Sequence, residues 1–311
     1  MDKICHLDSF ENIISFINQA KEHLSPDFLI ILLGPTASGK TALAVRIAHA
    51  LDAEIISADS RQVYQHLDIG TGKDLKEYGD VPYHLIDIVP PTAKYNVENF
   101  KKDFQEASQL IRQKGKQVIL CGGTGSYIHS LLIAQPYAGI PKNQEFQDSL
   151  ASFSKEELSE QLESYEIPTD FHIDRDSKKR LIRSLEILNY LKHHEAPEKG
   201  EPIVKDYLVL GLNPGLTDRR SRIDRRLDNR LEEGLLAEVE SLLAKGLSHE
   251  DLMWFGLEYK YASLYLSGEM SLADFKSKLR TEIHRYAKRQ MTFFRKMEKD
   301  GVKIHWIEAK E

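Results

Sequence analysis

The sequence predicts an α/β fold, in which a parallel sheet has helices on both faces and a helical domain is inserted into the α/β core. Three observations lead to this prediction. Short apolar runs alternate with longer helical stretches, a glycine-rich loop joins the first run to the first helix, and the segment 141–198 is charged and has no strand-like run. Because neighbouring parallel strands need crossover connections, this alternation places helices on both faces of the sheet and ligands at the carboxyl ends of its strands.

The predicted strands are short apolar runs with the length of buried strands. They span Phe28–Leu33, Glu54–Ala58, His84–Ile88, Gln117–Cys121, Tyr207–Leu212 and Val302–Ile307. Helical patterns lie between most of them, at 39–51, 97–114, 124–134 and from about Thr217 to Lys245. We therefore expect one α/β core, formed by residues 27–140 and 199–311.

Two further regions precede or interrupt this core. Residues 1–26 form a predicted N-terminal helical extension outside it, with one apolar helix face made of Phe10, Ile13, Ile14 and Ile17. Residues 141–198 form a predicted helical insertion domain, with helices at about 144–152, 155–164 and 176–193.

Composition and charge narrow the classes of function. The chain has 311 residues and only two cysteines, Cys5 and Cys121, whose spacing matches no metal site. Because no apolar run reaches membrane-spanning length and no signal-peptide pattern is present, we expect a cytoplasmic protein without a membrane segment. We further expect a monomer. The net charge of -6 opposes nucleic-acid binding. Basic side chains nevertheless gather in Arg219–Arg230 and Lys276–Lys299, which suits either a polyanion or ordinary solvated helix faces.

A phosphate-binding loop is the strongest motif in the sequence. It fits the pattern G-x-x-x-x-G-K-[ST] between an apolar run and a helical stretch, and consists of Gly34, Pro35, Thr36, Ala37, Ser38, Gly39, Lys40 and Thr41. Its glycines let backbone N–H groups surround an oxyanion, and the helix N-terminus adds partial positive charge. Lys40 supplies a full charge, and Thr41 offers a hydroxyl ligand to Mg2+. The motif predicts a P-loop NTPase-like sheet, but it leaves open which phosphate is bound.

Two further constellations lie at predicted strand ends. Asp59 follows the second strand, where its carboxylate can bind a metal or take a proton from an acceptor near the phosphate. Its alternative role is to cap a following helix. The turn Gly122–Tyr127 offers the Thr124 hydroxyl at a helix start, although two glycines after a strand often form only a tight turn.

Arginines near a predicted helix start bear on the choice of ligand. Arg222 and Arg226 follow the fifth strand, where they can clamp a diphosphate or simply face solvent. Beyond Asp59 and Asp87, no apolar run closes on an aspartate of the kind that holds Mg2+ for ATP hydrolysis. The sequence therefore argues against an ATPase.

Taken in chain order, these motifs resemble the bacterial tRNA dimethylallyltransferases, also called tRNA isopentenyltransferases. The resemblance covers roughly residues 28–307 and rests on GPTASGKT at Gly34–Thr41, ISADSRQVY at Ile56–Tyr64, LDIGTGK at Leu67–Lys73, HLIDI at His84–Ile88, CGGTGSYI at Cys121–Ile128, KRLIRSLEI at Lys179–Ile187, RIDRRLDNRLEEGLLAEV at Arg222–Val239 and AKRQMTFFRK at Ala287–Lys296. Several of these segments, such as DIGTGK and GGTGSY, are not shared with general P-loop kinases.

The resemblance implies transfer of a dimethylallyl group from dimethylallyl diphosphate to the exocyclic amine of the adenosine on the 3′ side of the tRNA anticodon. It implies that the P-loop, with Arg222 and Arg226, holds the donor's diphosphate instead of ATP, and that Mg2+ binds at Thr41. Asp59 is the implied general base, while Lys40 and Arg222 help the diphosphate to leave. The expected tRNA contacts, which include the insertion domain, are Asp59, Ser60, Arg61, Gln62, Thr124, Lys179, Arg180, Leu181, Ile182, Arg183, Lys288 and Arg289.

Two positions depart from the family's pattern. Glu258 stands where a basic residue is expected, and Gln147 replaces a basic residue that is usual near the start of the insertion. Both positions belong to the side expected to face tRNA. Because an acidic residue there repels phosphate, we expect Glu258→Arg to tighten tRNA binding or to broaden the range of tRNAs accepted. Two alternatives remain open, namely a small-molecule P-loop kinase in which Asp59 activates a hydroxyl, and a paralogue that binds tRNA without modifying it.

Overall fold

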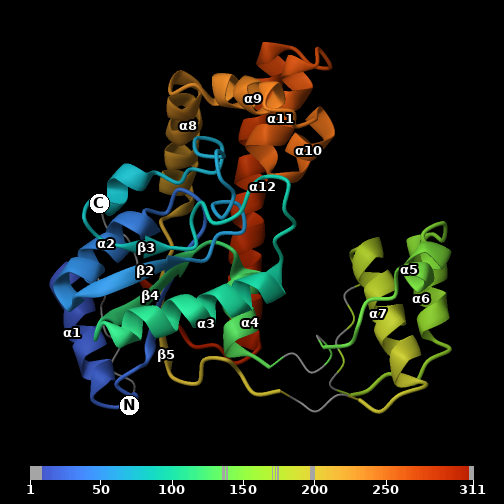
Figure 1. Ribbon diagram of the computed structural model, residues 1–311, viewed down its shortest axis with the longest axis horizontal. Coiled ribbons are helices and arrows are strands. Elements are labelled where there is room, and N and C mark those ends of the chain that lie inside the picture. Colours follow the sequence, from blue (N-terminus) through green and yellow to red (C-terminus); the bar gives the residue numbers. More distant parts are fainter. Residues whose placement is uncertain are drawn as a thin grey trace. The chain divides into compact units, whose positions relative to one another are not determined.

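The computed structural model describes residues 9–134, 137, 139–169, 171, 173, 175–196 and 200–307. The chain divides into two units, one formed by 1–132 with 203–311 and the other by 133–202 (Figure 1). The predicted insertion, 141–198, lies within the second unit. Cys5 and the first part of the predicted N-terminal extension lie outside the described residues.

A six-stranded parallel sheet forms the centre of the first unit, in the order β3-β2-β4-β1-β5-β6. Its strands are β1 (Leu29–Leu33), β2 (Ala53–Ser57), β3 (Tyr83–His84), β4 (Gln117–Gly122), β5 (Tyr207–Leu212) and β6 (Ile304–Ile307). The three strands β1, β2 and β4 lie next to one another, and almost every side chain in them is buried. Since all strands run in the same direction, the loops that follow β1, β2, β4 and β5 meet at one edge of the sheet.

The strand prediction is confirmed for five of the six runs and is wrong for most of His84–Ile88. Only His84 of that run belongs to β3. Leu85 and Asp87 have φ angles of 61° and 58°, which interrupt an extended strand at the sheet edge.

Helices cover both faces of the sheet, as the sequence predicts. The helices α1 (Phe10–Lys21) and α2 (Lys40–Leu51) pack on one face, and α3 (Val97–Gln113) and α4 (Gly125–Leu132) lie on the other (Figure 1). Ile13 and Ile17 of α1 are buried in the same apolar cluster as Ile30 and Leu32 of β1. The predicted N-terminal extension therefore packs directly against the core.

Between β5 and β6, the first unit is helical. It contains α8 (Leu216–Glu232), α9 (Leu235–Ala244), α10 (His249–Trp254), α11 (Leu257–Leu266) and the long α12 (Leu272–Lys299). The single helix predicted from Thr217 to Lys245 is wrong, because the chain turns at Gly234, whose φ of 102° suits glycine and no other residue well. In Figure 1, α12 runs beside α4, α8 and α11.

The second unit has its own core between α5 (Gln144–Leu150), α6 (Lys155–Leu162) and α7 (Lys178–Leu191). Its buried side chains are Leu150, Leu158, Leu162, Leu181, Leu185 and Leu188. The three helices lie where the sequence predicts them. Among the described residues of the whole chain, no helix is long and apolar enough to cross a membrane.

Candidate active site

The phosphate-binding loop has the strand–loop–helix context that its sequence predicts. It leaves β1, passes through left-handed φ angles at Ala37 and Gly39, and enters α2 at Lys40. Burial lowers the pKa of Lys40, whose Nζ lies 3.5 Å from the carbonyl oxygen of Pro35. The hydroxyl of Ser38 is buried without a hydrogen-bond partner among the described residues. A loop with a buried cation and an unpaired hydroxyl is suited to an anionic ligand.

A glutamine from α12, which the sequence did not reveal, holds this loop in place. Gln290 Oε1 accepts the N–H of Thr36 at 2.9 Å, and its Nε2 donates to the carbonyl of Gly123 at 2.9 Å. Gln290 is buried next to Met291 on the apolar face of α12. A polar residue at a buried position of an amphipathic helix was the available signal.

The Asp59 loop and the turn after β4 are joined by hydrogen bonds. Thr124 donates its N–H to the carbonyl of Ala58 at 3.1 Å, and its hydroxyl accepts the N–H of Ser60 at 3.0 Å. Asp59 Oδ1 accepts the N–H of Arg61 at 2.9 Å. No helix follows Asp59, so the helix-cap alternative is wrong, although this carboxylate does stabilise the turn.

Two cavities, with empty volumes of about 1390 Å³ and 950 Å³, meet at the phosphate-binding loop. The larger one is lined by Asp59 and by side chains of α10, α11 and α12, while the smaller one is lined by residues 37–41 and by α8. Four residues line both cavities, namely Lys40, Thr41, Arg226 and Arg230. Three cationic side chains therefore stand at the boundary between the space beside the loop and the space beside Asp59.

Three of the arginines of α8, Arg222, Arg226 and Arg230, are spaced four residues apart and so lie on one face of the helix. Arg222 Nη1 lies 3.8 Å from the point that a Cβ atom on Gly39 would occupy. Arg226 forms an ion pair with Asp74 at 2.6 Å. Arg230, which the sequence analysis did not select, forms an ion pair with Glu258 at 2.8 Å.

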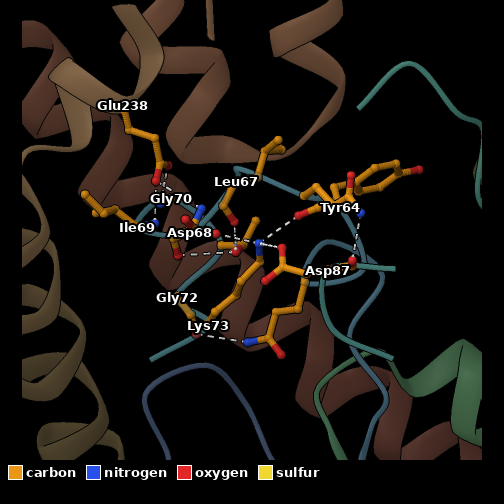
Figure 2. A network of polar contacts seen from close by, with 12 residues as sticks. Tyr64, Leu67, Asp68, Ile69, Gly70, Gly72, Lys73, Asp87 and Glu238 are labelled. Atoms are coloured by element: carbon orange, nitrogen blue, oxygen red, sulfur yellow. Dashed lines mark hydrogen bonds and ion pairs between the residues drawn. The ribbon is translucent and has the colours of Figure 1, made fainter. Parts of the chain in front are cut away.

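Arg226 and Arg230 contact carbonyl groups of the loop Leu67–Lys73. A network of polar contacts holds this loop in place (Figure 2). Lys73 is almost fully buried and donates to the carbonyl of Tyr64 at 2.8 Å, to Asp68 at 2.6 Å, and to Asp87. The carboxylate of Asp87 is therefore paired with Lys73 within the protein. From the other side, Glu238 of α9 accepts the N–H groups of Asp68, Ile69 and Gly70 at 2.7 to 3.0 Å.

Gly72 lies where this loop meets the guanidinium groups. A Cβ atom at Gly72 would lie 2.3 Å from Arg226 Nη2 and 1.7 Å from Arg230 Nη2, and the φ of Gly72 is 61°. Only glycine permits this approach. The fixed loop thus sets the position of both guanidinium groups.

Comparison with known proteins agrees with the fold. The model of the family described as IPP transferase matches residues 62–297, and that of a second family, described as Isopentenyl transferase, matches residues 28–80. The chain belongs to the IPP transferase family. This confirms the resemblance that the motifs indicate.

Curated relatives and solved structures are similar over nearly the whole chain. A "tRNA dimethylallyltransferase 2" of Phocaeicola vulgatus is 48% identical over 285 residues, which cover 90% of this chain and 92% of the relative. A "tRNA dimethylallyltransferase 1" of Parabacteroides distasonis is 47% identical with the same coverage. The crystal structure of the tRNA isopentenylpyrophosphate transferase of Bacillus halodurans matches with a TM-score of 0.66 and 30% identity, covering 91% of this chain and 90% of that one.

A structural match with lower sequence identity comes from a eukaryotic protein. The structure of a eukaryotic dimethylallyltransferase acting on tRNA has a TM-score of 0.72 and 26% identity to this IPP transferase family member. The match covers 89% of this chain and 73% of that protein.

The residues expected to contact RNA in the first unit fall into two groups. Gln62 is committed to structure, because it donates to the Gly72 carbonyl and accepts from the Ser57 hydroxyl, both at 2.9 Å. Arg61 lies over the ring of Trp254, 4.5 Å from its centroid, at the wall of the larger cavity. Lys288 and Arg289 are exposed on α12, and Arg289 also lines this cavity.

The expected contacts in the insertion unit differ in exposure. Lys179 and Arg180 are exposed, whereas Ile182 is half-buried. The prediction that Leu181 contacts tRNA is wrong, because its side chain is fully buried in the core of the unit and does not face solvent. Arg183 donates to the carbonyl of Ile140 at 2.6 Å and forms an ion pair with Glu186, so it holds the unit together.

The two departures from the family's pattern have partners within the protein. Gln147 donates to the carboxylate of Glu186 at 3.0 Å, inside the insertion unit. The carboxylate of Glu258 pairs with Arg230 and is only 16% exposed. Glu258 is therefore paired within the protein, and an arginine at this position would face the buried Arg230. That Glu258→Arg tightens tRNA binding stays a prediction.

Proposed function

We propose that this protein transfers a dimethylallyl group from dimethylallyl diphosphate to the exocyclic amine of the adenosine on the 3′ side of a tRNA anticodon. The names of its curated relatives and the eukaryotic structure acting on tRNA support this activity. The observation that carries the proposal is the cationic boundary between the two cavities, with Asp59 on one side of it. When the diphosphate group of the donor binds at this boundary, the donor's allylic carbon points toward the larger cavity.

The proposed chemistry is a displacement at that carbon. The carbon–oxygen bond to the diphosphate breaks, and its electron pair stays on the leaving oxygen, while the adenosine nitrogen bonds to the carbon. Lys40, Arg222 and Arg226 stabilise the charge that grows on the diphosphate. The carboxylate of Asp59 takes the proton that the amine releases.

The larger cavity offers apolar as well as polar surface to the reactants. Phe255, Leu257 and Ile283 are among its lining residues, and they suit the hydrocarbon part of the donor. On the RNA side, we propose that the exposed cations Lys179, Arg180, Lys288 and Arg289 contact phosphates of the anticodon stem-loop.

Mg2+ fits the chemistry of the site. This ion takes oxygen ligands and usually keeps several waters, with few protein ligands plus phosphate oxygens. The Thr41 hydroxyl lines both cavities, and the buried Ser38 hydroxyl lacks a partner within the described part of the chain. We propose that Thr41 holds Mg2+ together with diphosphate oxygens, where the ion supplies further charge stabilisation to the leaving group.

The alternatives predicted from the sequence gain no support from the site. A protein that only binds tRNA has no use for Lys40, Thr41 and Asp59 around one cavity. A kinase would bind ATP at the same loop. The family that matches this chain is described as IPP transferase and not as a kinase family. We also propose that the protein is a monomer and is located in the cytoplasm.

Mass spectrometry of anticodon-loop nucleosides tests the proposal. Unmodified tRNA is incubated with the protein, Mg2+ and dimethylallyl diphosphate, and we expect the adenosine beside the anticodon to gain one dimethylallyl group. Omission of the donor is the control. Calorimetry with ATP and with dimethylallyl diphosphate completes the test, since tight ATP binding without modified tRNA would favour the kinase.

A further inference from the structure

Arg230 is a buried cation at the proposed site to which neither the motifs nor the proposed chemistry assigns a role. Its side chain is 8% exposed, and it lines both the larger and the smaller cavity. Its Nη1 donates to Glu258 at 2.8 Å and lies 3.4 Å from the carbonyl oxygen of Gly70. Its Nε is buried and has no hydrogen-bond partner among the described residues.

The surroundings of Arg230 are those of an anion-binding group. Burial and the nearby Arg226 lower the pKa of Arg230, and Glu258 opposes that effect. Two guanidinium groups held against Gly72 repel each other, and a buried N–H without an acceptor is costly. A dianionic or trianionic ligand at the boundary of the cavities would offset the repulsion between the two guanidinium groups.

We infer that Arg230 is a further diphosphate-binding residue, that the loop Leu67–Lys73 positions its guanidinium group, and that Glu258 is the counter-ion of this group in the free protein. The inference rests on the proposed function, since it concerns the same donor. It also gives the departure at position 258 a physical meaning. Glu258 lines the larger cavity, where a basic side chain would add a cation, and in this protein Arg230 of α8 supplies that cation instead.

The rival explanation is that Arg230 and Glu258 only tie α8 to α11. In a purely structural pair, the loss of either partner destabilises the fold and neither loss acts on the donor. If Arg230 binds diphosphate, the two partners act differently. Removal of the Arg230 charge weakens donor binding, whereas removal of the Glu258 charge frees the guanidinium group and leaves binding unchanged or tighter.

Three variants separate these explanations. Glu258→Gln keeps an oxygen acceptor for Arg230 but removes the negative charge. Arg230→Met combined with Glu258→Gln removes both charges, so it leaves no unpaired ion in the interior and the fold is retained. Arg225→Gln is the matched control, because Arg225 is an exposed arginine of the same helix and lines neither cavity.

The measurements are the melting temperature of each variant and calorimetric titration with dimethylallyl diphosphate and with inorganic pyrophosphate, both in the presence of Mg2+. We expect the double variant to bind both ligands about ten- to a hundredfold more weakly than Glu258→Gln, the usual effect of one charge-assisted hydrogen-bonding group. We expect Glu258→Gln and Arg225→Gln to bind at least as tightly as the unaltered protein.

The possible outcomes distinguish this inference from the proposed function. If the double variant binds as tightly as Glu258→Gln, Arg230 is a structural residue and the inference is overturned. If the unaltered protein binds neither dimethylallyl diphosphate nor pyrophosphate, the proposed function itself fails.

Discussion

Asp59 has a structural contact in addition to its proposed role as the base. Its Oδ1 accepts the N–H of Arg61, which fixes the orientation of the group at the wall of the larger cavity. A carboxylate held in this way is ready to take a proton without first losing rotational freedom.

Asp59→Asn tests the proposed base. The amide keeps an oxygen for the N–H of Arg61 but cannot take a proton at neutral pH. We expect turnover to fall roughly a hundred- to ten-thousandfold, with donor affinity nearly unchanged. Single-turnover kinetics and donor titration measure the two quantities. Near-normal turnover in this variant would show that another group accepts the proton.

The sequence revealed those site residues that have a fixed local spacing. Lys40 and Thr41 were found because the loop motif is contiguous, and Asp59 because it follows an apolar run. Gln290 was not found, since its partner Thr36 lies 254 positions away. Glu238 was missed for the same reason, because the N–H groups that it accepts lie about 170 positions earlier. Such roles exist only once the chain has folded.

At the scale of elements, the sequence predicts the positions of most strands correctly, but it predicts fewer of their first and last residues. β5 spans the predicted Tyr207–Leu212, since both of its faces are covered and its apolar run is continuous. β3 is shorter than predicted because it is an edge strand, where pairing on one side allows turns at Leu85 and Asp87. The helix break at Gly234 could have been suspected from the glycine alone.

The sheet edge also contains a buried charge cluster that makes stability depend on pH. Glu54 of β2 is 2% exposed, and it accepts bonds from His84 at 2.8 Å and from Lys114 at 2.9 Å. Burial raises the pKa of Glu54, but the hydrogen bonds from His84 and Lys114 outweigh burial and leave the pKa below its ordinary value of 4.5.

Glu54→Gln tests this cluster. Because the folded-state pKa is lowered, the carboxylate stabilises the fold above about pH 4.5, and this contribution is lost as the pH falls through the folded-state pKa. At pH 7 we expect the variant to lose about 1–3 kcal/mol of unfolding free energy. The difference should shrink below pH 4.5 in urea titrations. A difference that stays constant with pH would mean that the charge of Glu54 contributes nothing.

At the scale of the whole molecule, a net charge of -6 coexists with proposed RNA binding because the charge is unevenly placed. Lys288 and Arg289 are exposed on α12, whose other side packs against the core. Cations gathered on one surface attract a polyanion even when the total charge is negative.

Reversal of two charges on α12 tests this surface. In Lys288→Glu with Arg289→Glu we expect weaker tRNA binding and a salt dependence that is flatter by roughly one unit of log–log slope per lost contact. Lys102→Glu on α3, where the side chain is 76% exposed, is the control. Filter binding across a salt series gives the slopes. Equal slopes for all three proteins would place the RNA away from α12.

The hydrogen bond from Thr36 to Gln290 affects when the site can form during synthesis of the chain. The phosphate-binding loop leaves the ribosome early, but the side chain that fixes it belongs to a helix synthesised 254 residues later. Closing so long a loop is slow, so we expect the phosphate-binding loop to lack this contact while the chain is still being synthesised. In the proposed function, the site would then become fully competent only after α12 has been translated and packed.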